Sequence, residues 1–101
     1  MNDRIKNIQK QEEILDKMDA FLEEIEKITE EWKEIQPQFL ELVDYYQSPQ
    51  WMQDYEDYDI GKLPKMKCGV LSQDAVYNTI SEHRRVTVDL MKTALAAIES
   101  F

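Results

Sequence analysis

The segment Ser48–Tyr77, SPQWMQDYEDYDIGKLPKMKCGVLSQDAVY, separates two long stretches of helical pattern. Both glycines, two of the three prolines and the only cysteine lie in this segment, together with Trp51, Tyr55, Tyr58 and Tyr77. Because glycine and proline interrupt regular helices, the segment predicts two helical arms that meet at an irregular centre.

The stretch before this segment repeats apolar residues every seven positions between residues 5 and 35. A repeat of this kind, three rows wide, is typical of a long amphipathic helix that contacts two neighbouring helices. It predicts a helix over about residues 3–35, in which Leu22 and Ile25 are shielded from water. The three adjacent rows are Ile8, Leu15 and Leu22; Met18, Ile25 and Trp32; and Ile14, Phe21, Ile28 and Ile35.

Pro37 is expected to end this helix, because its ring and its missing amide hydrogen disturb the preceding turn. We therefore predict a second helix over about residues 37–47, with Pro37 as its first residue. A kinked continuation of the first helix is the alternative, since no glycine or strong N-cap precedes Pro37.

Two serines are expected to begin the later helices. Ser48, followed by Pro49, is typical of an N-cap before a short helix of about residues 49–58. A connector follows over about residues 59–71. Ser72 then predicts the start of a helix over about residues 72–100, whose inward row includes His83 and Leu90.

A chain of 101 residues with 43% apolar and 33% charged residues suits one soluble domain, residues 1–101. The predicted fold class is all-α. We expect a small helical bundle of two long amphipathic helices and a bent, shorter middle helical segment, with no cofactor implied by any motif.

The net charge of −9 argues against binding to phosphate backbones or to anionic lipid surfaces, so neither nucleic acid nor membrane is an expected partner. The single Cys68 agrees with a reducing compartment. The first residues lack the apolar core of a secretory signal, and no window has the apolar length of a spanning helix. These features predict a cytoplasmic protein.

The run YYQSPQWMQDYEDYDIGKLPKMKCGVLSQDAVY, residues 45–77, resembles the signature of DUF4298, a family of small bacterial proteins of unknown function. The matching positions are Tyr45-Tyr46, Trp51, Asp54, Tyr55, Leu63-Pro64, Gly69-Val70-Leu71-Ser72 and Asp74. The chain departs from that pattern at Cys68 and Gln73. The resemblance covers nearly the whole chain and implies no activity, substrate or partner.

The acids between Asp54 and Asp59 raise the alternative of a divalent-cation or small-ligand site, because Ca²⁺ and Mg²⁺ prefer clustered carboxylate oxygens. The calcium-loop pattern fails here. Gly61 does not fall at the required glycine position, no Glu stands at the bidentate position, and the residues that follow include lysines. A solvated acidic face is therefore the preferred interpretation.

Catalytic chemistry finds little support in the sequence. Cys68 lies among lysines near a helix start, but the only candidate base, His83, is placed three turns into the last helix. We expect His83 to be a hydrogen-bonded residue at the core edge, and Arg84 and Arg85 to reach acids on the first helix. Without phosphate-loop, metalloprotease or hydrolase motifs, an enzyme is disfavoured.

The remaining candidate is a group of aromatic and acidic residues in the middle segment. Core packing is the preferred interpretation of its aromatics, and a partner surface is the functional alternative if they are exposed. The leading functional hypothesis is protein–protein interaction or self-association, and the weakest is an acidic mimic of nucleic acid. The candidate interaction surface comprises Trp51, Asp54, Tyr55, Asp57, Tyr58 and Tyr77.

Overall fold

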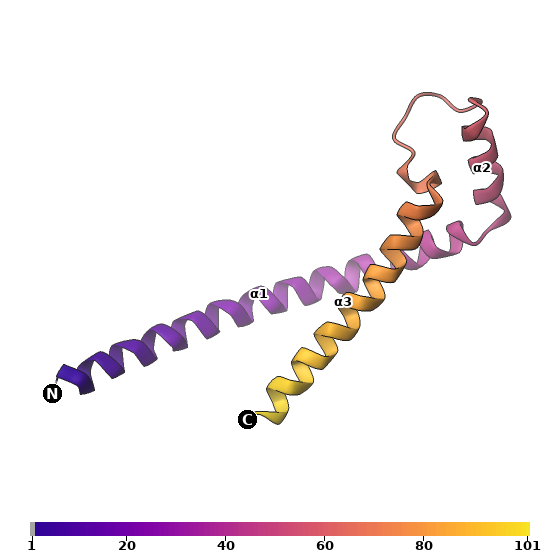
Figure 1. Cartoon of the computed structure of the whole chain (residues 1–101). Helices are drawn as coiled ribbons and strands as arrows, with labels where there is room; N and C mark the ends of the chain where they lie inside the picture. Colours follow the sequence, from indigo (N-terminus) through magenta and orange to yellow (C-terminus); the bar gives the residue numbers. More distant parts are fainter. Residues whose placement is uncertain (1) are drawn as a thin grey trace. The chain divides into compact units, whose positions relative to one another are not determined.

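The computed structural model describes residues 2–101, and Figure 1 shows the helices of this part of the chain. Helix α1 spans Asn2–Tyr46, α2 spans Pro49–Asp59, a short 3₁₀ helix η1 spans Gly69–Leu71, and α3 spans Gln73–Glu99. Residues 2–101 contain no strand. The predicted all-α class is confirmed.

Helix α1 continues through Pro37, so the predicted break at this residue is wrong and the helices expected at 3–35 and 37–47 are one. The apolar rows explain the continuation, because Phe39 and Leu42 follow Trp32 and Ile35 at the same seven-residue spacing. Pro37 lies on the exposed side of the helix. The carbonyl that loses its amide partner there can be hydrated, which lowers the cost of an internal proline.

Helix α2 begins and ends with regular capping interactions. The Ser48 hydroxyl accepts a hydrogen bond from the Trp51 amide at 3.2 Å, which confirms the predicted N-cap before Pro49. At the other end, Lys62 N–H donates to the Asp57 carbonyl at 2.8 Å and Gly61 N–H donates to the Tyr58 carbonyl at 3.1 Å. This is a Schellman ending, and Gly61 takes the positive φ of 79° that it requires.

Helix α3 follows η1 directly. The Ser72 amide donates to the Gly69 carbonyl at 3.0 Å and closes η1. The Ser72 hydroxyl accepts from the Ala75 amide at 3.3 Å, so the same residue caps α3 as predicted. Asp74 adds a negative charge in the first turn, where the helix dipole favours it.

The chain divides into two compact units, Met1–Leu40 and Glu41–Phe101. The described part of the first unit is a single helix. Its apolar rows are therefore not covered within that unit, and Leu22 and Ile25 are 50% and 37% exposed. Leu90 is also 42% exposed, so the expected shielding of these three residues is not found within their own units. The packing of the long helices into a bundle and the single domain stay predictions.

The second unit contains the buried apolar residues. Trp51, Leu71 and Val76, from α2, η1 and α3, are each 4% exposed. Trp51 comes before the irregular residues 60–68, and Leu71 and Val76 come after them. No helix within residues 2–101 has the length and apolar character needed to span a membrane.

Candidate functional site

The centre of the second unit is built around Trp51. Its indole N–H donates a hydrogen bond to the Val70 carbonyl at 2.9 Å, which ties α2 to η1. The side chain is buried, so a lost partner would leave a polar group without water. Trp51 therefore combines apolar burial with one directional hydrogen bond.

Two tyrosines contact the Trp51 ring. Tyr46, the last residue of α1, meets it edge to face with ring centroids 5.1 Å apart and an interplanar angle of 73°. Tyr55, one turn further along α2, stacks on it at 5.4 Å and 14°. The Tyr46 hydroxyl also donates to the Gln73 carbonyl at 3.3 Å. We call Tyr46, Trp51 and Tyr55 the Trp51 cluster.

Next to this cluster, Tyr45 and Asp54 form a short hydrogen bond. The Tyr45 hydroxyl donates to one Asp54 carboxylate oxygen at 2.5 Å, and the Gln50 side-chain amide donates to the other at 2.8 Å. Both Asp54 oxygens are thus occupied by donors from the chain itself. The pair joins the end of α1 to α2.

This pairing changes both acidities. Burial, together with the hydrogen bond to Asp54 and its negative charge, raises the pKa of Tyr45 to about 12. The hydrogen bond from Tyr45, followed by that from Gln50, lowers the pKa of Asp54. Tyr45 is therefore held neutral and Asp54 ionised at neutral pH, and the pair acts as a polar link.

The six residues predicted as an interaction surface fall into two groups. Trp51 is buried, so the predicted core packing holds for it, and Asp54, Tyr55 and Asp57 are half-buried. Asp57 accepts a hydrogen bond from the Gln53 side chain at 3.0 Å. Tyr58 and Tyr77 are 49% and 63% exposed. Of the six residues, these two tyrosines are the exposed aromatic ones.

The sequence arguments for the surface did not include Tyr45 and Tyr46, which hold Asp54 and Trp51 in place. A signal was available in the sequence. The two tyrosines lie two and three residues before the Ser48 cap. A helix that turns back at such a cap brings its last residues against the next helix.

The residues considered for catalysis, Cys68 and His83, and the neighbouring Arg85 lie in different parts of the second unit. Cys68 is a half-buried free thiol just before η1, close enough to influence the pKa of Tyr45. The half-buried His83 accepts a hydrogen bond at its carbonyl from the Thr87 hydroxyl at 2.6 Å. Arg85 pairs with Glu82 at 2.7 Å and Asp89 at 3.2 Å on its own helix, so the pairing expected for it with the first helix is wrong.

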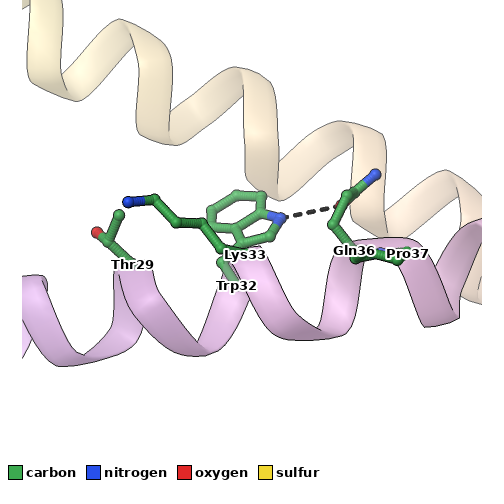
Figure 2. A pocket seen from close by; sticks show the side chains of 5 residues that line it. All are labelled: Thr29, Trp32, Lys33, Gln36 and Pro37. Atoms are coloured by element: carbon green, nitrogen blue, oxygen red, sulfur yellow. Dashed lines mark hydrogen bonds between the residues drawn. The ribbon is translucent and has the colours of Figure 1, made fainter.

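Between residues 2 and 101, no group of three or more His, Cys, Asp and Glu side chains is arranged to hold a metal ion. A shallow depression lies along α1 in the first unit, as Figure 2 shows. In it the Trp32 indole N–H donates to the Gln36 side-chain oxygen at 3.0 Å. The residues that line it are Thr29, Trp32, Lys33, Gln36 and Pro37.

A long solvent-facing apolar stripe runs along α1 within the first unit. Ile14, Phe21 and Ile28 from one row are 47%, 53% and 52% exposed. Leu15 and Met18 from the neighbouring rows are 54% and 52% exposed. We call this set, with Ile8, Leu22 and Ile25, the α1 apolar face. It is a second candidate site, formed by one helix alone.

Comparison with protein families gives one match. The profile described as "Domain of unknown function (DUF4298)" matches residues 8–93, which include most of α1, all of α2 and much of α3. Comparisons with curated proteins and with solved structures found no match. The chain belongs to the DUF4298 family.

Proposed function

We propose that the protein is a non-enzymatic helical module that acts by binding a protein, through the α1 apolar face. The observation that supports this proposal is the exposure of that face. Phe21 and Leu22 are half exposed, and Ile14 and Ile28 lie seven residues before and after Phe21. Contiguous apolar surface of this kind marks interaction sites in soluble proteins.

The second unit is held together by contacts at its own centre. The Trp51 cluster and the Tyr45–Asp54 hydrogen bond tie the last turn of α1 to α2. In the second unit the polar groups at the centre are occupied by one another, and Tyr58 and Tyr77 add exposed aromatic surface. A reducing, cytoplasmic setting is part of the proposal, and the free thiol of Cys68 is consistent with it.

A site-specific photo-crosslinker tests this function. Phe21 is replaced by benzoylphenylalanine in the full chain expressed in cells, and Glu23, on the opposite side of α1, is replaced in a control. Protein adducts at Phe21 that are missing at Glu23 are expected. Equal adducts at both positions, or none at Phe21, would reject the apolar face as the binding surface. The cation-binding and nucleic-acid-mimic alternatives stay predictions, because no contact in residues 2–101 favours them.

A further inference from the structure

The row of residues beside the α1 apolar face carries an ordered charge pattern. Lys10, Lys17, Glu24 and Glu31 follow one another at seven-residue spacing, next to the row that contains Ile14, Phe21 and Ile28. All four charged side chains are exposed. None of the ion pairs found within residues 2–101 includes any of them. The first half of this row is basic and the second half is acidic.

We propose that the α1 apolar face binds the same face of a second copy of this chain, with the two helices antiparallel. The proposal rests on the proposed function and names its partner. In an antiparallel pair, each flanking row faces the same row of the partner, with its order reversed. Lys10 then faces Glu31 of the other copy, and Lys17 faces Glu24.

Both pairs require the same two-fold axis. The midpoint between Lys10 and Glu31 and the midpoint between Lys17 and Glu24 both lie between residues 20 and 21. A two-fold axis there repeats each pair on the other side of the interface, so four opposite-charge contacts form. A two-fold interface is self-complementary by definition, and this row meets that condition.

The next row outward alternates in sign, but it too places opposite charges together when its order is reversed. Lys6 and Glu34 have opposite charges and are centred on Ala20, and so are Glu13 and Lys27. These residues lie further from the apolar seam and contribute mainly to the long-range field. Two rows therefore favour the same register.

The apolar layers agree with this axis. Side chains in a helix incline toward its N-terminus, so the layers of the seam are shifted by about one residue from the flanking row. Met18 then packs against Phe21 of the second copy, and Ile14 packs against Ile25. The other flank of the seam brings Leu15 near Leu22 of the second copy, both apolar. The pair thus has one charged flank and one apolar flank, which accounts for an apolar stripe wider than a two-helix seam.

A parallel pair does not use these charges. Its flanking rows would bring Lys10 next to Leu15 and Lys17 next to Leu22 of the other copy. Such contacts contain no opposite charges, and they would place lysines over apolar side chains. The charge order therefore selects the antiparallel direction.

Charge reversal tests the pairing in the full chain by sedimentation equilibrium. The unmodified protein is expected to have the mass of two chains, with weaker association at high salt. E24K/E31K and K10E/K17E each place like charges at all four contacts. Each is expected to raise the dissociation constant of the dimer by roughly 30-fold or more, from the sum of several modest ion pairs.

Two rescues make this test specific. An equimolar mixture of E24K/E31K and K10E/K17E is expected to form a heterodimer, because every contact is again between opposite charges. The fourfold exchange K10E/K17E/E24K/E31K is expected to restore the homodimer. Failure of both rescues would overturn the proposal even if E24K/E31K and K10E/K17E each dissociate on their own.

The matched control changes the outer surface of the same helix. D16K/E23K adds the same positive charge as E24K/E31K, but Asp16 and Glu23 lie on the side opposite the apolar face. This variant is expected to remain a dimer with a dissociation constant within about threefold of the unmodified protein. Equal dissociation of both variants would mean that total charge alone controls association.

Spin labels determine the direction of the helices. In a Cys68→Ser background, labels at Ala20→Cys lie near the two-fold axis, and labels at Gln9→Cys lie near opposite ends of the pair. At ~1.5 Å per residue, the two Gln9 labels are expected to lie roughly 30 Å apart along the helix axis. Equal distances for Gln9 and Ala20 would show a parallel pair and overturn the proposal.

If the protein stays monomeric at all concentrations, the proposal that a second copy binds the α1 apolar face is also wrong. The Phe21 crosslinks then separate this result from a failure of the proposed function. Adducts only to other proteins would leave the binding function standing, and no adducts would remove both.

Discussion

The Trp51 indole donates its hydrogen bond to the Val70 carbonyl, 19 positions later in the chain and 2.9 Å away. This contact closes the irregular connector against α2. It also places Leu71, the last residue of η1, among the few buried residues of the second unit. The stability of this unit should therefore depend strongly on one indole.

Two replacements of Trp51 are expected to destabilise the second unit by different amounts. Trp51→Phe keeps an aromatic ring but leaves the Val70 carbonyl without its donor, at a cost of about 1–3 kcal/mol. Trp51→Ala also removes the ring and is expected to cost about 3–5 kcal/mol. Urea unfolding followed by circular dichroism measures both. Met52→Ala, at a neighbouring 48% exposed position, is the control and should cost less than about 1 kcal/mol.

The two glycines should respond differently to alanine. Gly61 has φ 79°, where a β-carbon is strained, so Gly61→Ala is expected to destabilise by about 1 kcal/mol. Gly69 has no such φ, and a β-carbon there meets no atom within 4 Å. Gly69→Ala is expected to be neutral or to stabilise by up to about 1 kcal/mol, through the unfolded chain. Equal thermal shifts for both variants would contradict the Schellman ending of α2.

Replacing the two helical prolines by alanine should change stability by different amounts. Pro37→Ala gives α1 back an internal amide donor and is expected to stabilise it by about 1–3 kcal/mol, with higher helicity by circular dichroism. Pro49→Ala changes a first-turn position where no amide partner is lost, and its effect should stay below about 1 kcal/mol. Lower helicity in Pro37→Ala would show that the proline is required for the path of α1.

The Tyr45–Asp54 pair should make stability depend on pH at both extremes. The pKa of Asp54 is lowered by folding, so its contribution is present above the pKa of an unfolded Asp and is lost as the pH falls through the folded value. The pKa of Tyr45 is raised to about 12, so its contribution is present below pH ~10 and is lost as the pH rises toward 12.

Ultraviolet absorbance of the tyrosinate and unfolding midpoints measured against pH check both effects. One tyrosine is expected to ionise near pH 12, and Tyr45→Phe should remove that step and reduce the alkaline loss of stability. Tyr58→Phe, at an exposed position, is the control and should leave the late step in place. A late step that persists in Tyr45→Phe would assign it to another residue.

The helices and their starts could be predicted because they depend on residues close in sequence. Ser48 and Ser72 cap amides three positions later, and the apolar rows follow from a helical period. The break predicted at Pro37 is wrong because the apolar rows keep their seven-residue spacing on both sides of this proline. A local penalty of a few kcal/mol is outweighed when the residues on both sides favour one continuous helix.

The site was less predictable. Residue type made Trp51, Asp54 and Tyr55 candidates for the interaction surface. It did not predict which of them are buried. The partners of Trp51 and Asp54 that lie outside α2 are Val70, Tyr46 and Tyr45, and no period relates these positions. Their meeting depends on how the connector and the turn at Ser48 fold.

The amino-acid sequence by itself determined an acidic, all-α chain, the capped ends of its later helices, and an apolar stripe flanked by an ordered row of charges. All of these follow from interactions within one or two helical turns. Only the tertiary structure decided that Trp51 is a buried link, that Tyr45 holds Asp54, and that Tyr58 and Tyr77 face solvent. Burial and long-range hydrogen bonds depend on which distant segments the folded connector brings together, and local pattern carries no information about that.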